Sequence, residues 1–185
     1  MVLVFSMQLD RGKYFGSLLM VGFGVFAFYR WHQTQLLFFL LLVLRDFAAG
    51  YFFLRRSPAL VKSTLRTNLL AYISASMPLF YFSSIEASRT VLFVSDILAI
   101  IGFLLVSLAT IELGASIGIS PAKRRLVSTG IYRWIKHPMY AGYVISEFGM
   151  TLVNPLNLFL FFISLSLYCL RARAELKILS SSPPD

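Results

Sequence analysis

The sequence predicts an all-α integral membrane protein, a bundle of about six transmembrane helices that ends in a helical hairpin. Of its 185 residues, 58% are hydrophobic, and the mean hydropathy is +0.76. Only 14% are charged, against about 25% in soluble domains, so the chain cannot cover a water-facing surface with polar groups. The basic residues lie between long apolar runs rather than along a polar face, which is typical of membrane proteins and argues against nucleic-acid binding.

Six segments are apolar enough to be helices in a bilayer, where a spanning helix needs about 20 residues. They cover residues 14–29, 33–54, 67–83, 92–116, 139–153 and 156–170. Pro78 lies inside the third segment and predicts a kink there. The last two segments are short, and Asn154-Pro155 separates them. Because proline breaks a helix and favours a tight reversal, we expect these two segments to form the helical hairpin.

The net charge of +9 predicts the orientation of the bundle. With six spans and the N-terminus in the cytosol, the cytosolic segments hold 14 of the 17 lysines and arginines. The opposite side holds only Arg30 and Arg89, and Arg45 falls within a span. This bias follows the positive-inside rule, so we expect both termini and the 117–138 loop to face the cytosol.

Several charged residues interrupt the apolar segments and are functional candidates because they are costly in a bilayer. They are Arg45, Asp46, Asp96, Glu112 and Glu147. Arg45 and Asp46 can satisfy each other between helices, and Asp96 is close to the outer interface. Glu147 lies two helical turns after Tyr140, so it either faces the same cavity or sits near the outer interface. The sequence does not decide the roles of Arg45, Asp46, Asp96 and Glu147.

We expect a single membrane domain over residues 1–185. Residues 1–112 form its N-terminal helical bundle part, and residues 113–185 carry the chemistry. No cleavable signal peptide is expected, because the apolar start is short and lacks a basic segment before it. One cysteine, Cys169, excludes a disulfide framework and a cysteine-built metal site. We expect no metal.

Residues 126–140 contain the densest set of chemically useful side chains. Pro138 is favoured in the first turn of a helix, where free backbone N–H groups, together with His137, would form an anion site. Tyr132, Trp134 and Tyr140 add aromatic faces that can hold a ligand cation such as a sulfonium.

This stretch resembles the signature of the isoprenylcysteine carboxyl methyltransferase family, which includes bacterial membrane methyltransferases and, more distantly, phospholipid methyltransferases. The matching residues are Leu126-Val127, Gly130, Tyr132-Arg133 and Lys136-His137-Pro138-Met139-Tyr140, with Lys136 where the family usually has arginine. The family's second element is an arginine followed four residues later by glutamate, here Arg171 and Glu175, a spacing that places both on one helix face. Leu176 stands where a second glutamate is common, and the usual basic tail is missing. The resemblance covers residues 113–179.

The resemblance implies an S-adenosylmethionine-dependent methyltransferase. The implied cofactor-binding residues are Arg124, Arg125, Leu126, Val127, Tyr132, His137, Pro138, Met139, Tyr140 and Glu175. Arg171 and Glu175 would be the catalytic pair, with Arg171 orienting the methyl acceptor by clamping a carboxylate.

The acceptor stays open. A carboxylate, as in an isoprenylcysteine, arrives ionised and needs no general base, whereas a phospholipid amine must lose a proton; a thiol is a further alternative. Two other classes also stay open: a non-catalytic membrane protein that keeps the fold, and a reductase, since longer sterol reductases share a His-Pro-x-Tyr element. The expected partners are the lipid bilayer and a lipophilic acceptor, with no nucleic acid. The short chain suggests a prokaryotic cytoplasmic membrane, while the oligomeric state and the effect of the short tail remain undecided.

Overall fold

The computed structural model describes residues 11–56, 61–62, 64–84, 86–116, 118, 122–123 and 127–180, and α-helices dominate them. The α-helices are α1 (Arg11–Thr34), α2 (Leu37–Arg55), α3 (Leu65–Ser76), α4 (Arg89–Leu113), α5 (Pro138–Val153) and α6 (Asn157–Ser180). Short 3-10 turns lie at η1 (Met77–Phe80), η2 (Gly114–Ser116) and η3 (Gly130–Arg133). Two-residue strands, β1 (Val61–Lys62) and β2 (Ala122–Lys123), pair in antiparallel fashion.

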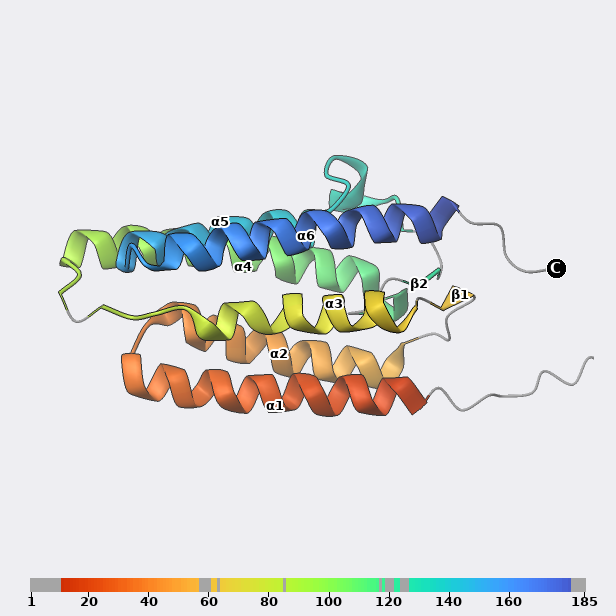
Figure 1. Cartoon of the computed structure of the whole chain (residues 1–185), viewed down its shortest axis with the longest axis horizontal. Coiled ribbons are helices and arrows are strands. Elements are labelled where there is room, and N and C mark those ends of the chain that lie inside the picture. Colours follow the sequence, from red (N-terminus) through yellow and green to blue (C-terminus); the bar gives the residue numbers. More distant parts are fainter. Residues whose placement is uncertain are drawn as a thin grey trace, which may run out of the picture.

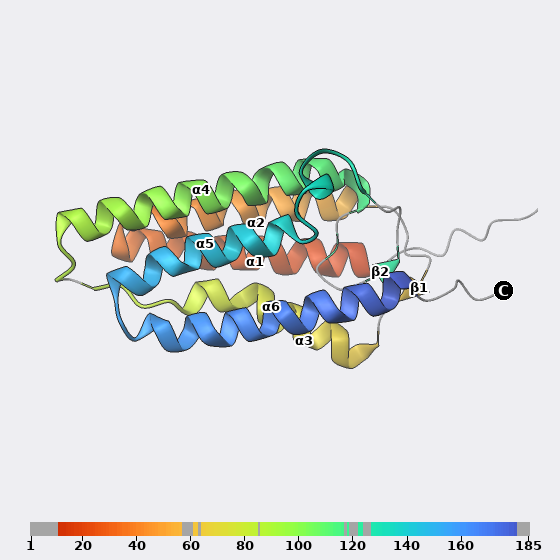
Figure 2. The same ribbon diagram turned by 90° about the horizontal axis from the view of Figure 1, so that it is seen from above.

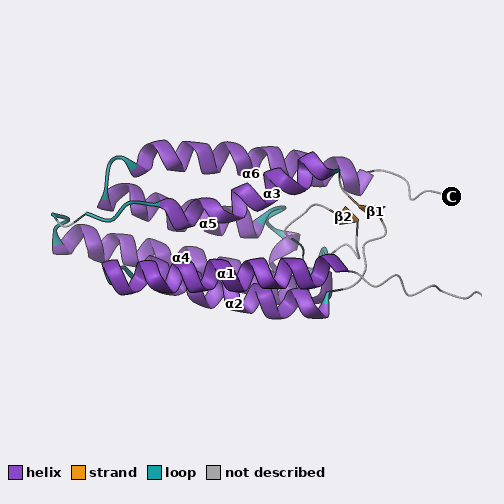
Figure 3. Cartoon of the chain, turned by 60° about the horizontal axis from the view of Figure 1, so that its bottom comes forward, coloured by secondary structure: helices purple, strands orange, loops and turns teal. Residues whose placement is uncertain are grey.

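The helices run lengthwise and alternate in direction along the chain (Figure 1). The start of α1, the end of α6, the β1–β2 pair and η3 therefore lie at the same end of the bundle, as Figure 2 also shows. Figure 3 shows α1, α2 and α4 on one side and α3, α5 and α6 on the other. This arrangement brings the two ends of the described chain and the segment after α4 to one end of the molecule.

All six expected helical segments are present, and four of them are long and apolar enough to cross a membrane. These are α1 from Gly12, α2, α4 and α6 up to Ile178. The other two are shorter, since α3 has 12 residues and α5 has 16. The expected number of six spanning segments is therefore supported for four of them.

The expected reversal at Asn154-Pro155 is confirmed, whereas the helix expected to continue with a kink at Pro78 instead ends at Ser76. At Pro78 the α-helix gives way to the tighter turn η1, because proline has no N–H to continue the α-helical pattern. At Asn154-Pro155 the chain reverses between α5 and α6. Asn157 closes this reversal, because its side-chain amide donates to the carbonyl of Met150 at 2.7 Å. The C-terminal helical hairpin is thus present.

Small residues allow α4 and α5 to approach closely. A Cβ added to Gly142 would lie 2.5 Å from the carbonyl oxygen of Gly102 and 2.7 Å from a methyl group of Val106. A side chain at Gly102 would meet the backbone of α5 in the same way. Close helix approach over small residues is a common packing mode in membranes. It fixes α5, which carries His137 and Tyr140 at its start, against α4.

Candidate functional site

The carboxylate of Glu175 on α6 faces the first turn of α5. The phenol of Tyr140 donates a hydrogen bond to Oε1, and Nδ1 of His137 lies 3.4 Å from Oε2. His137 occupies the N-cap position of α5 and Tyr140 is its third helical residue, so both reach the same neighbour. The side chains of His137 and Glu175 are each 26% exposed, so this end of the cluster is open to a ligand.

Aromatic rings stack behind this carboxylate. The ring of Tyr140 is parallel to that of His137 on one side and to that of Tyr168 on the other, with centroids 5.5 Å apart in both pairs. Tyr143 continues the stack at 5.7 Å from Tyr168. The stack joins residues from α5 and α6 and restricts the orientation of Tyr140.

Arg171 on α6 supplies the positive charge of the cluster. Its guanidinium carbon lies 5.0 Å from the centre of the Tyr140 ring, and Nη1 donates to Oγ of Ser74 on α3 at 3.4 Å. The residue is buried. A buried arginine over an aromatic face is held in place by packing as well as by hydrogen bonds. Tyr140 therefore contacts both charges: the Arg171 guanidinium lies over its ring, and its hydroxyl donates to the Glu175 carboxylate.

The turn η3 is held at the end of α4 by Glu112. Both carboxylate oxygens of Glu112 accept from the backbone N–H of Ile131, at 2.8 and 3.1 Å. Gly130 has φ of +57°, and any Cβ there would collide with the Glu112 carboxylate. The hydroxyl of Tyr132 donates to the carbonyl of Ala109 at 3.4 Å. Burial, followed by the negative charge of Glu175, raises the pKa of Tyr132 above its ordinary value.

The structure brings together four of the residues singled out from the sequence, namely His137, Tyr140, Arg171 and Glu175. The negative charge of Glu175 also contributes to the raised pKa of Tyr132. Pro138 is buried at the first helical position, and Val127 and Met139 are half-buried. Arg124, Arg125 and Leu126 lie outside the described residues.

Sequence reasoning did not find Ser74, Tyr143 or Tyr168. Tyrosines in apolar helices look like ordinary membrane residues, and Ser74 belongs to a helix far away in sequence. The sequence makes Glu112 a functional candidate because a charge is costly in a bilayer, but it does not predict the contact of Glu112 with η3. The signal that could have predicted this contact is Gly130 in the turn together with an acidic residue, Glu112, at the end of the preceding helix.

Two polar groups inside the bundle have clear partners. Nε and Nη2 of Arg45 donate to Oδ1 of Asp46 at 2.7 and 2.5 Å, so these neighbours form the expected ion pair, while Oδ2 of Asp46 is buried without a hydrogen-bond partner among the described residues. Glu147 is buried rather than near a wet interface, and it accepts from Tyr81 at 2.9 Å and from Tyr168 at 2.5 Å. Tyr168 donates to Glu147 and stacks on Tyr140, so it connects this buried carboxyl to the candidate site.

The described residues contain no group of three or more histidine, cysteine, aspartate or glutamate side chains that could hold a metal ion. The functional groups available in the cluster are therefore a carboxylate, an imidazole, a guanidinium and stacked aromatic rings. This set of groups suits a small ligand that carries both a positive and a negative charge.

The fold and this cluster define an integral membrane protein of packed helices with a charged, aromatic cluster at one end of the bundle. Residues 97–181 match the model of the isoprenylcysteine carboxyl methyltransferase family, which is the family that the sequence resembles. The matched region contains His137, Tyr140, Arg171 and Glu175, so the resemblance found in the sequence is confirmed. No curated protein and no solved structure matches the chain.

Proposed function

We propose that this protein is an S-adenosylmethionine-dependent methyltransferase that methylates a lipophilic acceptor at the cytosolic face of the membrane. The observation that carries the proposal is the convergence of two distant segments, residues 137–140 and residues 171–175, around the Glu175 carboxylate. Both segments belong to the region that matches the family.

The chemistry of these side chains fits S-adenosylmethionine, which carries a sulfonium, an ammonium and a carboxylate. Glu175 would hold the ammonium or the sulfonium charge, helped by the aromatic faces of Tyr140 and Tyr132. His137 and the free N–H groups at the start of α5 would bind the carboxylate. Arg124, Arg125, Leu126, Val127, Pro138 and Met139 would complete the cofactor-binding residues, as the family resemblance implies.

When bound, the cofactor supplies a methyl group activated by the positive sulfur. The protein residues then have to position the acceptor, and good positioning can contribute about 7–11 kcal/mol to lowering a bimolecular barrier. Arg171 would clamp an acceptor carboxylate through its planar guanidinium. A carboxylate is the favoured acceptor because it arrives ionised, while Glu175 and His137 are already engaged with the cofactor and each other.

The charge distribution supports a cytosolic site. Of the basic residues that the structure describes, Arg30 and Arg89 lie at the far end of the bundle, and most others lie at the end that holds the cluster (Figure 1). The positive-inside rule assigns that richer end to the cytosol, where the cofactor is made. The expected setting is a prokaryotic cytoplasmic membrane.

Ligand-dependent stabilisation tests the proposal. The purified protein is heated with S-adenosylhomocysteine, with NADPH or with neither, and its unfolding temperature is recorded. A ligand present at 100 times its dissociation constant stabilises the folded state by about 2.7 kcal/mol. We expect stabilisation by S-adenosylhomocysteine alone. Stabilisation by NADPH alone would indicate a reductase, and the absence of any shift would leave only a non-catalytic protein that keeps the fold.

A further inference from the structure

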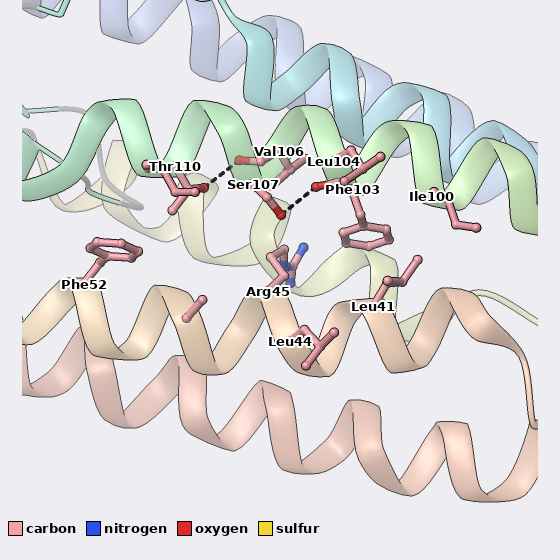
Figure 4. Close-up of a pocket in the computed structure, with 12 residues that line it drawn as sticks. Leu41, Leu44, Arg45, Phe52, Ile100, Phe103, Leu104, Val106, Ser107 and Thr110 are labelled. Carbon is pink, nitrogen blue, oxygen red and sulfur yellow. Dashed lines mark hydrogen bonds between the residues drawn. The ribbon is translucent and has the colours of Figure 1, made fainter.

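A cavity of about 490 Å³ lies between α2 and α4 (Figure 4). Its walls include Leu41, Leu44 and Phe52 from α2 and Ile100, Leu104 and Ile111 from α4. The lining residues extend over twelve positions along each helix, from 41 to 52 and from 100 to 111, which is about 16 Å at the rise of an α-helix. The cavity is therefore long and apolar, and its volume falls within the range of about 300–1,000 Å³ that small-molecule sites occupy.

The cavity opens on a surface that faces lipid. Leu44 is 62% exposed, Leu104 is 59% exposed and Ile111 is 66% exposed. All three belong to helices that are long and apolar enough to cross a membrane. The rim of the cavity is thus continuous with the hydrocarbon-facing surface of the bundle.

The polar groups of Ser107, Thr110 and Arg45 in the cavity lining already have partners within the protein. The hydroxyls of Ser107 and Thr110 each donate to a carbonyl of their own helix at 2.8 Å, as the dashed lines in Figure 4 mark. Arg45 points from α2 towards α4, but its charge is paired with Asp46 at 2.5 Å. A charged headgroup here would face an already neutral ion pair in a low-dielectric site, which is costly. The lining therefore selects an uncharged hydrocarbon chain.

Stacked aromatic rings lie between this cavity and the Glu175 cluster. The guanidinium of Arg45 lies over the ring of Tyr143 at 5.3 Å. Tyr143 stacks on Tyr168, and Tyr168 stacks on Tyr140. Arg171 lies beyond, over the ring of Tyr140. The cavity is accordingly a second site, and what it binds is independent of the proposed function.

We propose that the cavity between α2 and α4 binds one hydrocarbon chain of a bilayer lipid. The chain enters from the side of the bundle, lies along the two helices and covers the apolar walls. Because the chain comes from the bilayer and not from water, occupancy is favoured by the van der Waals contacts that it restores to the cavity walls. The headgroup stays outside.

Two leucines of α4 provide a matched test. Leu104 and Leu108 are exposed to similar extents, at 59% and 53%, but only Leu104 lines the cavity. The protein is reconstituted in phosphatidylcholine nanodiscs that contain a small fraction of phosphatidylcholine with a diazirine in the middle of one acyl chain. After irradiation, mass spectrometry quantifies the label on α2 residues 41–52. Leu104→Trp fills the cavity, Leu108→Trp adds the same side chain outside it, and Ala48→Met fills it from the opposite wall.

We expect Leu104→Trp and Ala48→Met to reduce labelling of this part of α2 by about fivefold or more, which corresponds to about 1 kcal/mol. Leu108→Trp should leave the labelling unchanged. Circular dichroism and the unfolding temperature establish that all variants are folded. Equal labelling in Leu104→Trp, Leu108→Trp and the unchanged protein would overturn the proposal, and so would the absence of label on α2 residues 41–52.

Discussion

Glu175 depends on its neighbours for its position. Tyr140 donates to one of its oxygens, and His137 lies next to the other. Since both neighbours belong to the first turn of α5, their side chains orient the carboxylate. In the proposed function, this orientation is what allows Glu175 to select a cationic group.

Replacing the carboxylate should weaken cofactor binding. A hydrogen bond to a charged group contributes about 1.5–3 kcal/mol, so Glu175→Gln should lower the affinity for S-adenosylhomocysteine by about 10–100-fold. Tyr140→Phe keeps the stacked ring but loses one hydrogen bond, and it should cost about fivefold. Isothermal titration calorimetry measures both. Leu176→Ala changes an exposed neighbour and is the control. Unchanged affinity in both Glu175→Gln and His137→Ala would refute the assignment of cofactor residues.

Arg171 should separate binding from transfer. Arg171→Ala should keep most of the affinity for S-adenosylhomocysteine and abolish methyl transfer, because the acceptor loses its clamp. Arg171→Lys should recover little activity, since lysine lacks the planar fork. Calorimetry and transfer of a radiolabelled methyl group provide the two readouts, and exposed Arg173→Ala is the control. Loss of cofactor binding with retained acceptor use would reverse this division of roles.

At the scale of elements, α6 connects the membrane-spanning part of the bundle to the candidate site. The apolar pattern of the sequence ends near residue 170, but the helix continues to Ser180. Arg171 and Glu175 therefore extend from a helix that begins at the hairpin and packs against α3 and α5.

Local signals in the sequence predicted the helices and the reversal at Asn154-Pro155, and the family resemblance singled out His137, Tyr140, Arg171 and Glu175, which the structure brings together. Hydropathy, proline chemistry and motif spacing act over short distances, so a single sequence reveals them. Contacts such as Arg171 with Ser74, 97 positions apart, depend on helix packing. No local sequence pattern predicts such long-range contacts. The same holds for Tyr168, whose role comes from the rings on either side of it.

The contact between α4 and α5 should be sensitive to the size of the side chain at Gly142. Gly142→Ala would place a methyl group 2.5 Å from a carbonyl oxygen of α4 and force the helices apart. Overpacking of this kind costs about 1–3 kcal/mol, so the unfolding temperature should fall. Gly22→Ala is the matched control, since a Cβ there meets nothing within 4 Å. If both variants unfold at the same temperature, the close approach of α4 and α5 is not important for stability.

The whole molecule has its two described ends and the candidate site at one end of the bundle (Figure 2). Charge counting predicts that both termini and the 117–138 loop face the cytosol, because the positive-inside rule depends on which loops carry lysine and arginine and not on packing. It could not reveal which helices touch, nor the cavity between α2 and α4.

Orientation in the membrane can be measured with single cysteines. In a Cys169→Ser background, Ser128→Cys should react with a membrane-impermeant thiol reagent only when the cytosolic side is accessible. Ser83→Cys, exposed near the other end of the bundle, should react from the outside. The reverse pattern would contradict a cytosolic candidate site.

The central claim is that the cluster around Glu175 transfers a methyl group to a lipophilic acceptor. Incubation of the purified protein with methyl-labelled S-adenosylmethionine and total membrane lipid tests it most directly, with the labelled product identified by mass spectrometry. We expect a labelled lipophilic product, most simply a methyl ester, that is lost in Arg171→Ala and Glu175→Gln. A folded protein that transfers no label to any lipid, or one whose activity survives both substitutions, would contradict it.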